Sequence, residues 1–439
     1  MMRLMWKKLV LCITIMTGLI VIGTRLPILT LVALAFGAFI IVQNDEQFGL
    51  SFLIFIMPMA TLFKLSITSP AFFTYLELLF VVMHFLRKKL QIDTVEVSIL
   101  LFGVYITVCE LANGGINVNA TIKMIAHLFI FYIGTQMKFD EHYRAHLYMY
   151  VFGVIISSII ANLDGFLPIK AYVLPEGYHN NGEYIGRFTG LYVDPNYYCV
   201  NVIISLCIIV LLYSRAEIGL WRLVVIAAPL FYFAIETVSK SAIIMIVMPI
   251  AFFLVTCLNR KKYGLLLLGV TMFAAVLVLA LENRIPALET IMTRMLNSSK
   301  NLDSFTTHRS ELWKMYFNYF MENMSRNIFG GSILYYTLNG AGAHNTYIDM
   351  IYQLGVFGSI FLVYVISTIF RNAKRFIGRT FVNYSVLLCI LIMYAALGEL
   401  QYFDPPYHFI MCYIVLNLPS AGERQSSNSP LVKTQISSV

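Results

Sequence analysis

Charged side chains are scarce in this chain. Asp, Glu, Lys and Arg make up 12% of its 439 residues, whereas 59% of the residues are hydrophobic. A soluble globular domain has about 25% charged residues. The scarcity of charge therefore excludes a soluble enzyme or binding domain and predicts an all-α polytopic membrane protein.

Cysteine is also sparse, and its spacing is uninformative. The seven cysteines lie in or beside apolar runs, and no two of them form a Cys-x-x-Cys pair. We therefore expect no disulfide framework and no zinc site, and interpret the cysteines as small apolar packing residues. The net charge of +8 does not predict binding to nucleic acid, because no basic helix or RNA-type aromatic motif accompanies it.

Several other features are missing. No internal repeat is visible, and no stretch is large enough for a separate soluble domain. No small-residue cleavage site follows the first apolar run, so we expect a retained helix rather than a signal peptide. Residues 1–419 are predicted to form one integral membrane domain. The Ser-rich tail 420–439 is predicted to be polar, cytoplasmic and disordered.

Long apolar runs are what the chain has in abundance. Several are shorter than the ~20 residues that cross a bilayer comfortably. Runs 8–22 and 26–43 fit a tight hairpin, and runs 221–236 and 241–257 are difficult to count. We expect about 12–14 membrane spans, within a range of 11–14. The runs lie near 8–22, 26–43, 48–63, 71–86, 97–112, 122–137, 145–161, 197–213, 221–236, 241–257, 263–281, 345–370, 381–397 and 405–419.

Basic residues predict the orientation of these spans. The short loops on one side carry clusters of Lys and Arg, which is the positive-inside pattern of cytoplasmic loops. Both termini are then cytoplasmic, and the two long loops, about 162–196 and 283–343, are extracytoplasmic. The clusters are Arg3, Lys7 and Lys8; Arg87, Lys88 and Lys89; Arg215 and Arg222; Arg260, Lys261 and Lys262; Arg371, Lys374, Arg375 and Arg379.

The first long loop ends in a motif that surrounds Arg187. Gly186 and Gly190 near this arginine let a ligand approach the backbone, although a solvated loop arginine is an alternative explanation. Asp194-Pro195-Asn196 follows. Asp is a good N-cap and Pro suits the first helical position, so a plain helix start explains these residues equally well.

Two further segments that are predicted to be extracytoplasmic carry candidate site residues. Lys240, in the short turn Glu236–Ser241, is a candidate ligand for an anion, or simply a lysine that extends to the lipid headgroups. In the second long loop, Arg309 opens a helical pattern that is expected to lie on the membrane surface or to cover a cavity. That helix is expected to end at Gly330-Gly331. The pattern consists of Leu312, Trp313, Tyr316, Phe320 and Met324.

His344 and Asn345 stand at the start of the next long apolar run. A helix N-terminus disfavours a histidine cation, so His344 would stay neutral and able to accept a proton. The same free N–H groups favour an anion nearby. An ordinary interfacial histidine remains the alternative.

Taken in order, these pieces resemble the O-antigen ligase/polymerase family of bacterial membrane glycosyltransferases. The matching residues are Arg187-x-x-Gly190 with Asp194-Pro195-Asn196, Thr237-x-Ser239-Lys240, Arg309-x-x-x-Trp313, and His344-Asn345 with Gly355-x-x-Gly358. Where the family usually has Thr-x-Ser-Arg, this chain has Lys240. Lysine keeps the charge but loses the two-pronged contact that arginine makes with a phosphate.

The resemblance implies a reaction. The donor would be a polyprenyl-diphosphate-linked oligosaccharide, such as one on undecaprenyl diphosphate, and the acceptor a growing glycan. Arg187, Lys240 and Arg309 would stabilise the leaving diphosphate, and His344 would act as general base. Asn196 and Asn345 would help to bind the glycan or the diphosphate. No cofactor or metal is expected, because the Asp-x-Asp motif and the nucleotide-binding domain of nucleotide-sugar transferases are missing.

Three functions stay open at this point, besides a purely structural or sensory membrane protein. A polymerase of O-antigen, capsule or exopolysaccharide, acting at the outer face of the bacterial cytoplasmic membrane, is favoured by the segment Arg187–Tyr198. A ligase that transfers finished glycan to lipid A core is the alternative within the family. A flippase or other transporter is a different class, for which Glu77, the main charge within a span, is the only pointer. A buried structural contact of Glu77 with a partner such as a hydroxyl or a histidine is an equally good explanation. Chain-length regulator and flippase proteins are expected partners of a polymerase.

Overall fold

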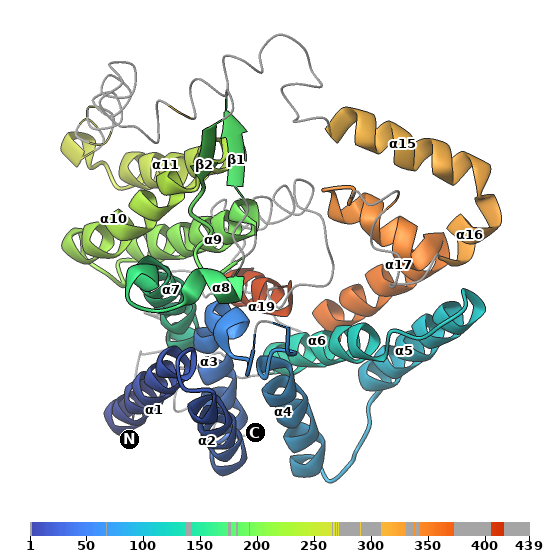
Figure 1. The fold of residues 1–439 in the computed structure, drawn as a ribbon. Helices are drawn as coiled ribbons and strands as arrows, with labels where there is room; N and C mark the ends of the chain where they lie inside the picture. The colour runs from blue at the N-terminus through green and yellow to red at the C-terminus, as the bar shows by residue number, and fades with distance from the viewer. Residues whose placement is uncertain are drawn as a thin grey trace, which may run out of the picture.

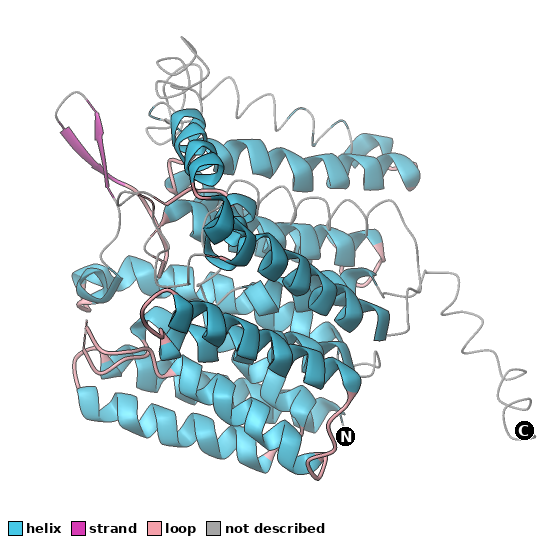
Figure 2. Cartoon of the chain, turned by 90° about the vertical axis from the view of Figure 1, so that its right-hand side faces the viewer, coloured by secondary structure: helices cyan, strands magenta, loops and turns pink. Residues whose placement is uncertain are grey.

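The computed structural model describes most of the chain. The described residues are 2–66, 68–136, 143–173, 177–180, 183–192, 194–265, 309–330, 342–372 and 405–416, with single residues at 267, 269, 271, 290 and 338. Within them the fold is a bundle of long helices, many of which run roughly parallel (Figure 1, Figure 2). A two-stranded antiparallel hairpin, β1 (Gly177–Asn180) and β2 (Glu183–Gly186), projects from one end of the bundle.

In the described part of the chain, helices coincide with twelve of the fourteen apolar runs that the sequence predicts. The runs 263–281 and 381–397 lie largely or wholly outside it, so the total of 12–14 spans stays a prediction. The helices are α1 (Met2–Gly23), α2 (Pro27–Gln43), α3 (Glu46–Ile56) with the 3-10 turn η1 (Met57–Leu62), α4 (Phe73–Arg87), α5 (Thr94–Ala112), α6 (Val118–Gln136), α7 (Tyr143–Ala161), α9 (Pro195–Ser214), α10 (Leu220–Glu236), α11 (Lys240–Asn259), α17 (Thr346–Asn372) and α19 (Pro405–Leu416).

The helices have the composition of membrane spans. Six stretches in the described residues are at least 18 residues long and apolar enough to cross a bilayer, and the remaining apolar helices are shorter. Large hydrophobic side chains are exposed along them, which a lipid-facing surface requires. The predicted class, an all-α polytopic membrane protein, is confirmed. The six stretches are Met5–Gly23, Thr94–Ala112, Val118–Gln136, Tyr143–Gly165, Pro195–Ser214 and Thr346–Arg371.

Polar contacts join the helix ends at one end of the bundle. Lys8 donates to Asn44 at 2.6 Å, and the side chain of Arg260 donates to the carbonyl of Ser214 at 2.7 Å. All of these residues lie on the side that the sequence predicts to be cytoplasmic.

A separate set of contacts joins segments predicted to be extracytoplasmic. Lys64 donates to the carbonyl of Tyr172 at 3.0 Å, and Tyr172 in turn donates to the carbonyl of Thr24 at 3.3 Å. The two sets match the alternation of spans that hydropathy predicts. Which set faces the cytoplasm stays a prediction.

The first long loop contains short elements of secondary structure. It contains a 3-10 turn, η2 (Asn162–Gly165), the short helix α8 (Ile169–Val173) and the β1–β2 hairpin. The all-α prediction therefore holds for the described spans, with one small hairpin added in a loop.

Helix α9 lies at the centre of one group of helices. It packs against α7, α10 and α11, and nearly all of its side chains are buried. In its second turn Asn201 accepts hydrogen bonds from Tyr150 at 2.6 Å and from the His408 ring at 2.9 Å. These bonds hold α7, α9 and α19 together, so the N-terminus of α9 is fixed by a well-packed helix.

Glu77 is fully buried in α4 and has neighbours of the kinds expected. Tyr407 of α19 donates a hydrogen bond to one carboxylate oxygen at 2.9 Å. The Nε2 atom of His127, in α6, lies 3.7 Å from the other oxygen. The carboxyl group of Glu77 thus links α4 to α19 and α6, which is a structural role inside the bundle.

The second long loop contains two helices, α15 (Arg309–Glu322) and α16 (Met324–Phe329). Tyr316 of α15 is fully buried against Tyr352 of α17, with ring centroids 5.1 Å apart. The predicted helix is therefore present. It is divided at Asn323, so that α15 ends at Glu322, and α16 ends at Phe329 just before Gly330, which has a φ of +91°.

Helix α17 is broken at Gly355, which the continuous apolar run did not predict. The backbone there has φ +71° and ψ 178°, and a Cβ atom would lie 2.2 Å from the amide nitrogen of Gly330. Only glycine fits this conformation and this close approach. The two glycines thus form a tight joint between the end of α16 and the break in α17.

Candidate functional site

The N-terminus of α9 organises the site. The carboxylate of Asp194 accepts a hydrogen bond from the amide of Asn196 at 2.5 Å and caps the helix, and Pro195 occupies the first helical position. The predicted helix start is therefore confirmed. Asp194 is also buried, so its charge is held inside the protein at the point where the first long loop meets the bundle.

The segment that carries Arg187 is attached to the turn between α10 and α11. The Nε atom of Arg187 donates to the carbonyl of Thr237 at 3.2 Å, and the next amide, Phe188, donates to the carbonyl of Glu236 at 3.1 Å. Ser239 in the same turn donates to the Asn196 side chain at 2.6 Å. Three pieces of sequence thus meet beside the first turn of α9.

Lys240 belongs to this cluster by its backbone position. It is the first residue of α11 and directly follows Ser239, whose hydroxyl is bonded to Asn196. Val238, two positions before Lys240, has a φ of +48°, a conformation that a β-branched residue rarely adopts. The turn is therefore held in an unusual shape at this point, which is a frequent property of functional sites.

Arg309 faces the same helix end from α15. It interacts electrostatically with Asp194 and Tyr197, which are three residues apart and so share one face of α9. Burial lowers the pKa of the Arg309 guanidinium, and Asp194 and Tyr197 act in the opposite direction. The guanidinium keeps its charge, because an arginine side chain loses its proton only far above neutral pH.

His344 lies in the turn that leads into α17. Trp313 of α15 donates from Nε1 to the carbonyl of Ala343 at 2.9 Å, which ties the turn to α15. Although the imidazole is exposed, desolvation by the surrounding protein lowers the pKa of His344, and the Arg309 cation acts in the same direction. Asp194 has the opposite effect. A neutral imidazole near neutral pH is what a general base requires.

Asn345 caps α17. Its side-chain oxygen accepts hydrogen bonds from the amides of Tyr347 at 3.0 Å and Ile348 at 3.3 Å. These bonds give Asn345 a structural role that accounts for its position. The side-chain oxygen of Asn196 likewise accepts a hydrogen bond within the protein, from the hydroxyl of Ser239.

The predicted site residues therefore come from four separate segments that the fold brings together. Arg187, Asn196 and the start of α11 at Lys240 lie beside the first turn of α9. Arg309 and His344 are linked to that turn through the charge of Asp194. Asn345 is next to His344 in sequence and completes the cap of α17.

Asp194 is a member of this cluster to which the sequence assigns only a helix cap. A helix cap accounts for its residue type and position, so the sequence predicts no catalytic role for it. Its place seven positions after Arg187, in the same loop, is the only signal that the sequence contains. Its burial, which calls for a charged partner, is visible only in the structure. In the structure that partner is Arg309.

No metal site is seen in the described residues. No group of three or more His, Cys, Asp or Glu side chains there is placed to hold a metal ion. The cationic side chains Arg187 and Arg309 suit an anionic ligand instead.

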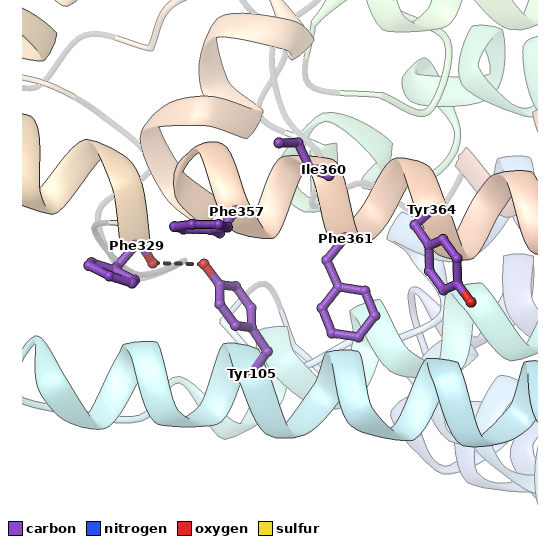
Figure 3. Close-up of a pocket in the computed structure, with 6 residues that line it drawn as sticks. All are labelled: Tyr105, Phe329, Phe357, Ile360, Phe361 and Tyr364. Atoms are coloured by element: carbon purple, nitrogen blue, oxygen red, sulfur yellow. Dashed lines mark hydrogen bonds between the residues drawn. The ribbon is translucent and has the colours of Figure 1, made fainter.

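A groove of about 500 Å³ lies between α5, the end of α16 and the second half of α17 (Figure 3). It is lined by Tyr105, Phe329, Phe357, Ile360, Phe361 and Tyr364. The hydroxyl of Tyr105 donates to the carbonyls of Phe329 at 3.0 Å and Leu354 at 2.9 Å, so it occupies the joint made by Gly330 and Gly355. The lining is almost entirely apolar.

The fold and the site define a polytopic membrane protein with a cationic cluster at one end of its helices. Residues 223–363 match the family model described as O-antigen ligase, which supports assignment of the chain to the O-antigen ligase/polymerase family. The matched stretch includes Thr237–Lys240, Arg309 and His344, and covers less than half of the chain. Searches of curated proteins and of solved structures give no match.

Proposed function

We propose that the protein is a polysaccharide polymerase that joins polyprenyl-diphosphate-linked repeat units at the outer face of the cytoplasmic membrane. The observation that supports it most is the gathering of Arg187, Arg309 and His344 around the N-terminus of α9. Two cations suit a diphosphate, and a histidine of lowered pKa suits deprotonation of a sugar hydroxyl.

The reaction is a direct displacement. His344 takes the proton of an acceptor hydroxyl while the hydroxyl oxygen attacks the anomeric carbon of the donor sugar. The bond from that carbon to the diphosphate oxygen breaks, and the electron pair leaves with the diphosphate. Arg187, Arg309 and Lys240 stabilise the negative charge that develops there. Attack opposite the leaving group inverts the anomeric carbon.

Asp194 has a supporting role in this proposal. Its carboxylate partly offsets the Arg309 charge, which otherwise would lower the pKa of His344 further. Asn345 and Asn196 hold the two helix starts that carry the reacting groups, so they act through position.

A ligase is the second candidate, because the matched family model carries that description. The chemistry at the donor is the same, and only the acceptor differs. A polymerase accepts the sugar of another lipid-linked unit, whereas a ligase accepts a different lipid such as lipid A core.

Purified protein in detergent, given a polyprenyl-diphosphate-linked repeat unit without ATP or an ion gradient, tests the proposal. We expect a ladder of longer glycans on a gel, which the His344→Ala variant makes about 10²–10⁴-fold more slowly. Transfer only after lipid A core is added indicates the ligase. Absence of transfer to either acceptor by folded protein overturns both candidates and favours a transporter.

A further inference from the structure

The Gly355-x-x-Gly358 motif shapes the apolar groove rather than the cationic cluster. Gly355 breaks α17 and leaves the carbonyl of Leu354 to accept a hydrogen bond from Tyr105. A Cβ atom on Gly358 would lie 2.6 Å from the Tyr105 ring. Both glycines are therefore required for Tyr105 to sit at the floor of the groove, and the groove is a built feature of the fold.

The groove is open on its outer side. Phe357, Ile360 and Tyr364 of α17 remain 55%, 62% and 50% exposed, and Phe329 of α16 remains 58% exposed. Fixed aromatic side chains with half of their surface uncovered offer a large apolar contact area to a hydrophobic ligand.

Helix α15 carries a second exposed apolar strip that begins near the site. At 3.6 residues per turn its residues divide into three faces. One face is packed on the protein and includes Tyr316, and a polar face carries Lys314 and Glu322. Between them, Phe317 is 62% exposed and Met321 is 61% exposed. A helix with one protein face, one polar face and one bare apolar face suits the boundary between membrane and water.

Both helices that carry reacting groups lead into the groove. Arg309 begins α15, which continues through α16 to Phe329 at the groove edge (Figure 1). His344 precedes α17, whose first nine residues, Thr346–Leu354, span about 14 Å before the break. A ligand with a charged head at Arg309 and a long apolar tail can therefore occupy the cluster and the groove together.

We propose that this groove holds the polyprenyl tail of the lipid-linked donor. The assignment rests on the proposed function, since that function supplies the donor. The tail leaves the diphosphate at Arg309 and His344, follows the first segment of α17 and packs on Phe357, Ile360 and Tyr364. The groove thus anchors the donor on one side of the site, and the opposite side is left for the acceptor.

The length of the tail provides the test. The double variant Phe357→Ala/Ile360→Ala is assayed with an undecaprenyl-linked donor and with a geranyl-linked donor, whose two isoprene units are too short to lie along the groove. We expect KM for the undecaprenyl donor to rise about tenfold, because two large apolar contacts are lost. KM for the geranyl donor and kcat for both donors should stay at wild-type values.

A matched control comes from α2. Ile28 and Phe39 there are 64% and 60% exposed, so Ile28→Ala/Phe39→Ala removes the same two side chains from another exposed surface. This control should leave KM unchanged for both donors. Equal KM changes for both donors, or none for either, overturn the groove assignment and indicate ordinary membrane lipid as its occupant. Failure of the wild-type protein to use either donor instead overturns the proposed function.

Discussion

Ser239 donates a hydrogen bond of 2.6 Å to the side chain of Asn196, which is 43 positions earlier in the chain. The bond joins the turn before α11 to the first turn of α9, so it fixes Lys240 beside the helix end that Arg309 faces. We expect Ser239→Ala to cost about 1 kcal/mol of stability, because it leaves a partly buried amide oxygen without its donor.

The same variant should also lose about 90% of the transfer rate, since the start of α11 is no longer held in place. Initial rates and thermal unfolding of purified protein measure both effects. Ser69→Ala, in an exposed turn, serves as the control. A wild-type rate for Ser239→Ala would show that the bond does not position the site.

The cations should have separable effects. Each of Arg187→Ala and Arg309→Ala removes a charge-assisted contact worth about 1.5–3 kcal/mol, so we expect the rate to fall at least tenfold while protein level is maintained. Lys240→Arg should be tolerated or improved, because arginine contacts phosphate with two donors. Lys240→Ala should be impaired.

Arg222→Ala is a matched control for charge removal, because Arg222 is exposed near the start of α10, at the other end of the bundle. Its rate should equal that of wild type. Normal glycan from all three alanine variants in the site would contradict the proposed binding of the diphosphate.

The membrane topology can be tested with single cysteines. In a cysteine-free version, Phe166→Cys should react with an impermeant thiol reagent in intact cells or spheroplasts, since Phe166 is 75% exposed and is predicted to be extracytoplasmic. Leu90→Cys, between α4 and α5, should react only after lysis. The reverse pattern would place the cationic cluster on the cytoplasmic side.

Hydropathy predicted the spans well because a bilayer demands long apolar helices whatever their neighbours are. The described helices coincide with the predicted runs, and the α9 cap at Asp194 followed from local backbone chemistry. The break at Gly355 was not predicted, because the apolar pattern continues through it and only the contact with Gly330 shows why the helix changes direction.

The sequence predicts candidate residue types for the site, whereas their arrangement depends on the fold. Motif order indicates Arg187, Arg309 and His344 as candidates, whereas the charge interaction between Asp194 and Arg309 depends on where the fold places the start of α15, which no local pattern contains. The bonds that Ser239 and Asn345 make likewise depend on the fold. They show that two predicted ligand-binding asparagines also position the backbone.

The joint between α16 and α17 should be sensitive to a single methyl group. We expect Gly355→Ala to destabilise the protein by about 2 kcal/mol or more, because φ is positive there and the Cβ atom meets the Gly330 backbone. Gly18→Ala in α1, where no atom lies within 4 Å of the added Cβ, should be neutral or slightly stabilising. Thermal unfolding in detergent compares them. Equal midpoints would contradict the close contact.

The pH dependence of the rate tests the roles of His344 and Asp194 together. A general base works when it is deprotonated, so the rate falls as pH drops through its pKa. Desolvation and the Arg309 cation lower the pKa of His344, so the wild-type acid limb should lie below pH ~6.5, the unperturbed value. Residual activity of His344→Ala should lack that limb.

Asp194→Asn makes the test specific to the site. Asparagine still caps α9, so the fold should persist, but the carboxylate that raises the pKa of His344 is gone. The acid limb should therefore move to still lower pH. Asp45→Asn, at the cap of α3 near the other end of the bundle, removes a similar carboxylate and should leave the limb unchanged. An unshifted limb in Asp194→Asn would mean that Asp194 only caps α9. A limb that persists in His344→Ala would make Glu311, or His308 outside the described residues, the next candidate base.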